Sequence, residues 1–180
     1  SMRKCDVTKM DVVFDLGNVL LRWDPRHLYR KVFSDEARME RFLLGACSHA
    51  WIHSIDGCGD FSEPIAARAK EFPEFAEELA MFDTRWLEML DGAMEDNLSI
   101  MRALKARGRP VYGLTNYPAQ KFEASRALHP FLDEFDVIVV SGREGVTKHE
   151  VGACFTSDKT GYVMLFAEGT HFTNEIRTDR

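Results

Sequence analysis

The sequence predicts an α/β fold in which a parallel sheet carries an inserted group of helices. Three short apolar runs have the character of buried strands, at residues 11–15, 111–114 and 137–140. Between the first and second runs, apolar residues recur at helical spacing through most of 26–107. Buried apolar strands separated by helical segments are typical of parallel sheets, which bind ligands at the carboxyl ends of their strands.

The first strand ends in a carboxylate. Val12-Val13-Phe14 is followed by Asp15, and a Gly17-Asn18 turn comes next. This pattern places Asp15 at the tip of a buried strand, where a carboxylate can serve as a nucleophile or as a metal ligand. The alternative is that Asp15 only caps the following turn, a common use of aspartate.

Helical periodicity follows the first strand. Residues 26–33 and 36–44 have apolar groups at helical spacing, and 62–72 and 74–90 resume the pattern after a turn-rich stretch. A bundle of about four short helices is therefore expected. Within it, His49 and His53 have the i, i+4 spacing of a metal pair, but we expect a loop there and find no third ligand.

These patterns divide the chain into two domains. The α/β core is assigned to residues 1–24 and 93–180, and the helical domain to 25–92, joined near 22–25 and 92–96. Further core helices are expected before Gly108 and over about 118–128.

The second and third strands also end in groups that can hold an anion. Leu114 is followed by Thr115-Asn116, and Ser141 follows the third strand with Lys148 a few residues later. In a parallel sheet these ends open on the same edge as Asp15. The combination suits attack by the carboxylate on an electrophile whose negative charge is stabilised by a hydroxyl and a cation.

At these three segments the chain resembles the haloacid dehalogenase-like hydrolases. The residues Phe14-Asp15-Leu16-Gly17-Asn18 with Trp23-Asp24-Pro25 are similar to the first motif of the branch related to sugar-phosphate phosphatases. Leu114-Thr115-Asn116 is similar to the second motif, and Ser141 to Gly145 leading to Lys148 is similar to the third. The resemblance covers about residues 11 to 148 and implies a Rossmann-like core with a small helical cap inserted after the first motif.

The resemblance also implies a reaction and a cofactor. Asp15 would attack phosphorus to form an aspartyl-phosphate that water hydrolyses, with Thr115 and Lys148 as the other catalytic residues. Mg²⁺ would be held by the Asp15 side chain, the Gly17 carbonyl and an acid from a fourth motif. The implied function is a Mg²⁺-dependent phosphatase acting on a small phosphorylated metabolite, such as a sugar phosphate.

Substrate contacts are expected next to the catalytic groups and from the cap. Asn116 is a candidate for shaping the pocket, Asp56 for facing the leaving group and Trp51 for stacking on a sugar. The alternative for Trp51 is packing in the helical core, and for Asp56 it is turn formation.

The chain departs from the family pattern at two places. Gly17 stands where most family phosphatases have an acid/base aspartate, so protonation of the leaving group needs water or another residue. After Lys148 the expected proline, helix and paired acids are missing, so this end is expected to be truncated or replaced. Glu168 is the first candidate for the absent metal ligand and Asp158 the second.

Two other functions stay open on these departures. A 2-haloacid dehalogenase would use the same aspartate without metal, although those relatives usually carry an aromatic residue where Gly17 stands. A non-catalytic protein that keeps the fold without a complete metal site is the third possibility.

Composition limits the class of partner. The chain has 180 residues and a formal net charge of −6, which does not favour nucleic acid as a partner. It contains no apolar run long enough to cross a membrane, so a cytoplasmic protein is expected. The four cysteines lack the spacing of a zinc site or a disulfide framework, which predicts reduced thiols.

Overall fold

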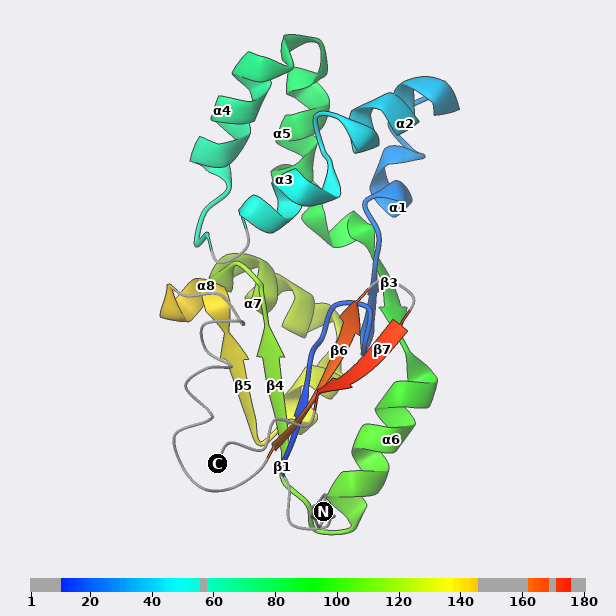
Figure 1. The fold of residues 1–180 in the computed structure, drawn as a ribbon, viewed down its shortest axis with the longest axis vertical. Helices are drawn as coiled ribbons and strands as arrows, with labels where there is room; N and C mark the ends of the chain where they lie inside the picture. The colour runs from blue at the N-terminus through cyan, green and yellow to red at the C-terminus, as the bar shows by residue number, and fades with distance from the viewer. Residues whose placement is uncertain (1–10, 56–57, 146–161, 169–170, 176–180) are drawn as a thin grey trace, which may run out of the picture.

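A five-stranded sheet forms the centre of the computed structural model, which describes residues 11–55, 58–145, 162–168 and 171–175 (Figure 1). The strand order is β5-β4-β1-β6-β7. The bounds are β1 Asp11–Phe14, β4 Val111–Thr115, β5 Val137–Val140, β6 Tyr162–Glu168 and β7 His171–Glu175. The first four strands are mutually parallel and β7 runs antiparallel to β6. The fold is therefore mixed α/β and compatible with a Rossmann-like arrangement.

The register of the sheet brings the strand ends together. Phe14 of β1 pairs with Gly113 of β4 on one side and with Leu165 of β6 on the other. Gly113 lies so close to the next strand that a Cβ there would be 3.0 Å from the Ile138 side chain. Because β5, β4, β1 and β6 are parallel, their carboxyl ends line one edge of the sheet, with neighbouring strands about 4.8 Å apart.

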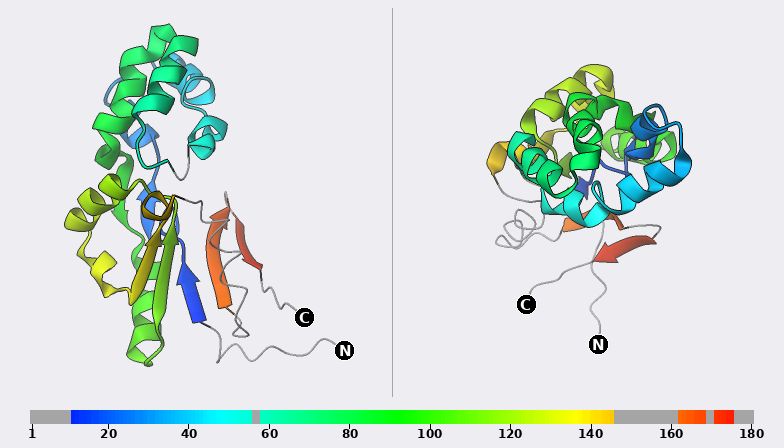
Figure 2. Two further views of the ribbon diagram at one scale, coloured as in Figure 1. Left: turned by 90° about the vertical axis from the view of Figure 1, so that its left-hand side faces the viewer. Right: turned by 90° about the horizontal axis from the view of Figure 1, so that it is seen from above.

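Two helices of the core cover one face of the sheet, α6 Glu95–Ala106 and α7 Ala119–Leu128 (Figure 2). The chain turns after α6 at Gly108, whose φ of 72° is a conformation that glycine adopts without strain. The 3-10 helix η4, Pro130–Glu134, leads from α7 into β5, and the short helix α8, Ser141–Glu144, follows β5 directly. Both expected core helices are therefore present.

A second group of helices lies beyond the carboxyl edge of the sheet (Figure 1). We call it the helical group, and it comprises α1 Arg26–Tyr29, α2 Glu36–Leu44, α3 His49–Ser54, α4 Ser62–Glu71, η2 Pro73–Phe75, α5 Ala76–Thr84 and η3 Trp86–Met89. Asp35 caps α2 by accepting a hydrogen bond from the Ala37 amide at 2.9 Å. Tyr29, Phe33, Phe42 and Phe75 pack as an aromatic cluster inside the group.

An antiparallel ribbon connects the two parts of the molecule. Strands β2 Leu21–Trp23 and β3 Leu90–Ala93 pair where the chain leaves the core and returns to it. The Arg22 side chain crosses the ribbon and donates to the Ala93 carbonyl at 3.2 Å. The two chain segments that connect the parts are thus paired with each other. This ribbon was not expected from the sequence.

Several sequence-based boundaries are wrong. His49 and His53 lie in helix α3 and not in a loop, because Ser48 caps that helix by accepting from the Trp51 amide. Their rings are 5.7 Å apart. The helix expected over 26–33 ends at Tyr29. The pattern over 74–90 is divided into η2, α5 and η3 followed by β3, since Arg85 leaves helical geometry with φ −120° and ψ 24°.

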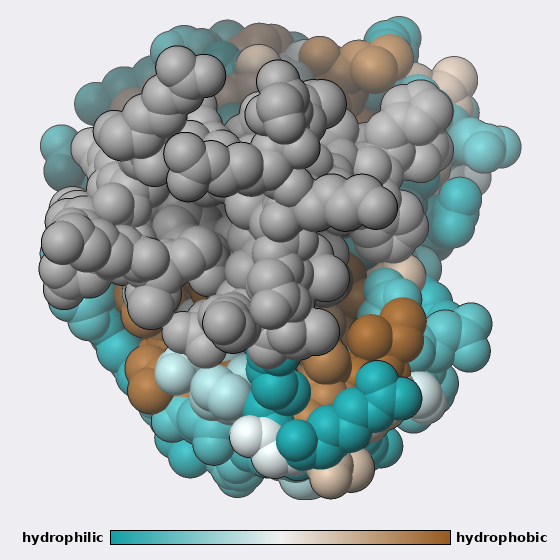
Figure 3. All heavy atoms as spheres, turned by 60° about the horizontal axis from the view of Figure 1, so that its bottom comes forward, coloured by the Kyte–Doolittle hydropathy of each residue, from teal (hydrophilic) through white to brown (hydrophobic). Residues whose placement is uncertain are grey.

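One hydrophobic cluster extends through both parts. It includes Phe14 and Met101 in the α/β core and Leu28 and Phe82 in the helical group, each at most 1% exposed. Figure 3 views the molecule from the end of the sheet that lies away from the helical group. On the described surface there, hydrophilic side chains alternate with smaller hydrophobic areas. No helix in the described ranges combines the length and the apolar character needed to cross a bilayer.

Candidate active site at the carboxyl edge of the sheet

Asp15 and Thr115 are buried side by side in the sheet order. Asp15 follows the last residue of β1 and is 4% exposed, while Thr115 ends the neighbouring strand β4 and is 2% exposed. Burial of a carboxylate is costly unless hydrogen bonds or opposite charges compensate for it. A buried carboxylate at the ligand-binding edge of a parallel sheet is therefore a candidate functional group.

The turn after β1 contacts the Asp15 carboxylate. Its Oδ1 accepts from the Leu16 amide at 2.8 Å. The later amides of the turn use backbone acceptors instead, because Leu20 and Leu21 donate to the Leu16 carbonyl and Asn18 donates to the Leu21 carbonyl. The turn is thus closed mainly by its own backbone, and Asp15 contributes one hydrogen bond to it, from the Leu16 amide.

The same turn leaves the Gly17 position open. A Cβ at Gly17 would have nothing within 4 Å, and the hydrogen bonds of the turn use the carbonyl oxygens of Leu16 and Leu21. Asn18 holds the left-handed conformation at φ 56° while its side-chain oxygen accepts from the Trp23 amide at 2.9 Å. The Asn97 side chain donates to the Val19 carbonyl at 2.7 Å and joins the turn to α6.

The loops after β4 and β5 are locked together. The Tyr117 amide donates to the Ser141 hydroxyl at 3.2 Å, and the Gly142 amide donates to the Tyr117 carbonyl at 3.0 Å. A Cβ at Gly142 would be only 2.5 Å from that carbonyl oxygen and 2.8 Å from the Ala119 nitrogen. Close approach of the two loops therefore requires glycine.

The remaining predicted residues are distributed differently. Asn116 is half-buried directly after Thr115. Glu168 is the last residue of β6, the strand beside β1, so the backbone brings it to the same edge as Asp15. Lys148, Asp56 and Asp158 lie outside the described residues.

Trp51 lies inside the helical group. It is 9% exposed, and its ring centroid is 5.4 Å from that of Phe82 in an edge-to-face arrangement. The Arg68 guanidinium lies 6.0 Å from the Trp51 ring centroid. These contacts are those of a packing residue, as in the second interpretation of this tryptophan.

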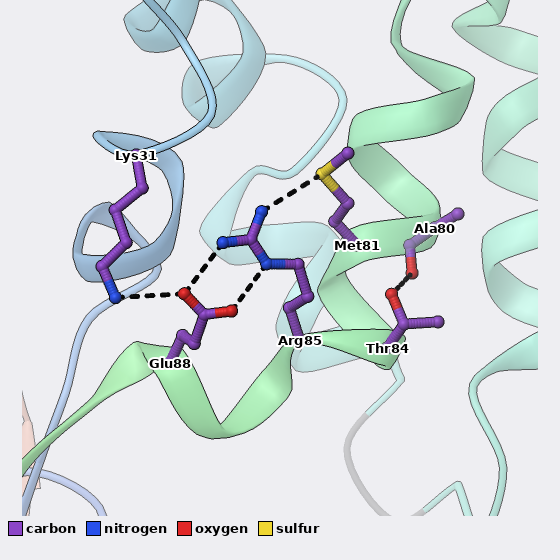
Figure 4. Close-up of polar contacts among 6 residues, drawn as sticks. All are labelled: Lys31, Ala80, Met81, Thr84, Arg85 and Glu88. Atoms are coloured by element: carbon purple, nitrogen blue, oxygen red, sulfur yellow. Dashed lines mark hydrogen bonds and ion pairs between the residues drawn. The ribbon is translucent and has the colours of Figure 1, made fainter.

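Arg85, another cation of the helical group, is engaged within that group. Its guanidinium contacts both carboxylate oxygens of Glu88, which also binds Lys31 at 3.1 Å (Figure 4). Hydrogen bonds from Arg85 and then Lys31 lower the pKa of Glu88 to about 2. Arg85 therefore contacts Glu88 of η3 and Met81 of α5, and Glu88 in turn contacts Lys31, which follows α1.

Tyr117, which the sequence did not single out, also organises this edge. Tyr117 is 5% exposed and its ring contacts Trp86 of the helical group, with centroids 5.8 Å apart. Burial raises the pKa of the Tyr117 phenol, and the Ser125 hydroxyl at 3.2 Å opposes that rise. The available signal was its position, directly after a polar pair at a strand end.

Metal ligands do not form a complete set in the described part of the chain. No three His, Cys, Asp or Glu side chains there come together to hold an ion.

Cys47 and Cys58 are free thiols, and burial raises the pKa of Cys47 to about 12, which keeps it protonated. A hollow of about 400 Å³ at the start of α4 is lined by Cys58, Gly59, Asp60, Glu63, Pro64 and Ala67, none of which belongs to the predicted site.

Comparison with known proteins gives a partial match to a phosphatase. A stretch of 53 residues is 42% identical to the sesquiterpene phosphatase astK of Aspergillus oryzae. The match covers 29% of this chain and 27% of the phosphatase. No protein-family model matches the chain, and no solved structure matches it. This similarity suggests a phosphatase, and hence a hydrolase.

Proposed function

We propose that the protein is a phosphatase that hydrolyses a phosphate monoester through an aspartyl-phosphate at Asp15. The supporting observation is the buried carboxylate at the end of β1 beside the buried hydroxyl of Thr115 at the end of β4. The partial similarity to a phosphatase agrees with this chemistry. A carboxylate nucleophile replaces one difficult displacement by two easier ones.

The proposed reaction has two steps. An Asp15 oxygen forms a bond to phosphorus while the bond from phosphorus to the alcohol oxygen breaks, and the departing alkoxide takes a proton from water. Water then attacks the aspartyl-phosphate, which releases inorganic phosphate and regenerates the carboxylate. Thr115 donates its hydroxyl hydrogen bond to a phosphoryl oxygen, and Lys148 balances the charge of the phosphate and the nucleophile.

The proposed cofactor is Mg²⁺, which prefers oxygen ligands. The Asp15 carboxylate and the Gly17 carbonyl, which the turn does not use, are suitable donors. Glu168 is the proposed third ligand because β6 ends at the same edge of the sheet as β1. When bound, the ion would reduce the repulsion between the anionic nucleophile and the phosphate.

The proposed substrate is a small phosphorylated metabolite, and Asn116 is proposed to shape the pocket around it. The helical group beyond the site edge is proposed to act as a cap that excludes water and selects the leaving group. Asp56 remains a candidate contact from this group. Because the matched phosphatase is named for a sesquiterpene substrate, terpenyl phosphates belong in a substrate screen beside sugar phosphates.

The test is hydrolysis of an aryl phosphate with and without Mg²⁺. Asp15→Asn removes the nucleophile at almost unchanged volume, so we expect a loss of about 10³-fold or more in kcat. Asp91→Asn is the matched control, because Asp91 is an exposed residue of the β2–β3 ribbon, and it should retain wild-type turnover. Circular dichroism would check that both variants fold.

Four results would contradict parts of the proposal. Retained activity of Asp15→Asn would exclude Asp15 as the nucleophile. Hydrolysis of the aryl phosphate that does not depend on Mg²⁺ would exclude the proposed cofactor. Halide release from a 2-haloacid without metal would indicate the dehalogenase reaction. A folded wild-type protein without either activity would indicate a non-catalytic protein.

A further inference from the structure

Tyr117 is the residue at which three parts of the molecule meet. It follows Thr115 and Asn116 on the loop after β4, and its neighbours belong to the end of β5, to α7 and to the helical group. At 5% exposure it is almost completely enclosed. Whatever holds Tyr117 in place also limits where the two preceding polar residues can lie.

The backbone of Tyr117 holds the β4 loop against the end of β5. Its amide donates to the Ser141 hydroxyl and its carbonyl accepts from the Gly142 amide, at 3.2 and 3.0 Å. The contact of this carbonyl with Gly142 leaves no space for a Cβ. The pair of bonds therefore aligns the loop after β4 with α8, the helix that leads toward Lys148.

The side chain of Tyr117 joins this loop to two layers of helices. Its ring packs edge-to-face on Phe122 of α7 and on Trp86 of η3, with centroid distances of 6.0 and 5.8 Å. Its hydroxyl accepts from the Ser125 hydroxyl. Among the described residues the buried Trp86 indole nitrogen has no hydrogen-bond acceptor.

We propose that Tyr117 is a positioning residue that fixes Thr115 and Asn116 relative to the end of β5. Because its ring packs on Trp86, the positions of these two residues depend on how the helical group packs against the α/β core. Tyr117 does not touch the reacting atoms. The catalytic part of this inference rests on the proposed phosphatase function, but the mechanical part does not.

The mechanical part is tested by hydrogen exchange in the absence of substrate. Tyr117→Leu keeps the backbone bonds possible but removes the ring contacts, so exchange at residues 116–117, at Gly142 and in η3 should become at least about tenfold faster. Tyr117→Phe retains the ring and should produce a smaller change. Phe131→Leu is the matched control, because Phe131 is 6% exposed and lies in η4, which precedes β5 at the opposite edge of the sheet.

Faster exchange at these segments in Tyr117→Leu, with a smaller effect in Tyr117→Phe and none in Phe131→Leu, would support the inference. Equal effects of Tyr117→Leu and Phe131→Leu, or no local effect of Tyr117→Leu, would overturn it. This result holds whether or not the protein has phosphatase activity.

The catalytic part is tested by steady-state hydrolysis of the same aryl phosphate. Misplacement of groups that act in the transition state lowers kcat more than it raises KM, and we expect Tyr117→Leu to lose about 10- to 100-fold in kcat. Phe131→Leu should keep kcat near the wild-type value at a temperature where both variants are folded. An unchanged kcat in Tyr117→Leu beside an active wild type would overturn the positioning role, whereas an inactive wild type would contradict the proposed function and leave the exchange result to decide the inference.

Discussion

Single residues determine the shape of the turn after β1. Asn18 has a left-handed conformation that costs most residues with a Cβ about 1 kcal/mol or more, and its side chain also accepts from the Trp23 amide. Asn18→Gly loses the hydrogen bond but not the conformational freedom, whereas Asn18→Ala loses both. We therefore expect Asn18→Ala to be less stable than Asn18→Gly by about 1 kcal/mol in urea unfolding. Equal stability of the two variants would argue against strain at this position.

Two glycines at the site edge should differ in how strongly the same substitution destabilises the protein. A Cβ at Gly17 enters open space, so Gly17→Ala should change the free energy of unfolding by about 0.5 kcal/mol or less. Gly142→Ala forces a Cβ against the Tyr117 carbonyl and should cost about 1–3 kcal/mol. Urea denaturation of both variants makes the comparison, and a Gly142→Ala protein as stable as Gly17→Ala would contradict the close approach of the two loops.

At the scale of elements, Glu88 of η3 pairs with Arg85, at the end of α5, and with Lys31, which follows α1. Its folded-state pKa is lowered from 4.5 to about 2, so its contribution to stability is complete above pH 4.5 and is lost as the pH falls toward 2. Glu88→Gln should therefore lower Tm at pH 7, and the difference from wild type should shrink below pH 4.5. Thermal unfolding at several pH values measures this, and a difference that grows in acid would contradict the assigned pairing.

Elements with strong local patterns were predictable from the sequence, and those that depend on distant partners were not. The β1, β4 and β5 strands were expected from their apolar runs, and α7 lies between Pro118 and Pro130, close to its expected limits. Strand β6 is a fourth parallel strand that was not among the three expected ones, and it lies in the segment after Lys148 that departs from the family pattern. The β2–β3 ribbon is too short to give a periodic signal and pairs residues about 70 positions apart. Strand β7 was overlooked because it alternates weakly and follows two residues after β6. The common edge of Asp15 and Thr115 was predictable because both residues come at the end of a strand in a parallel sheet. The burial of Tyr117 was not, because it depends on contact with Trp86 of the helical group.

At the scale of the whole molecule, the hydrophobic cluster is continuous between the α/β core and the helical group. Lys121 of α7 also binds Asp83 of α5, with its ammonium 2.6 Å from the carboxylate. We therefore expect one cooperative unfolding transition in which far-ultraviolet circular dichroism and tryptophan fluorescence coincide. Trp23, Trp51 and Trp86 all lie in the ribbon or the helical group, so two separated transitions would show that the parts unfold independently.

The central position of β1 has a consequence for the protein during its synthesis. Among the described strands β1 leaves the ribosome first, yet its two neighbours are β4 and β6, and the nearer of them in sequence begins about 100 residues later. At about 5–20 residues per second, the apolar run before Asp15 waits several seconds without a pairing partner. The nascent chain is therefore most exposed to aggregation in this interval, and a chaperone that binds extended apolar segments would act before β4 emerges.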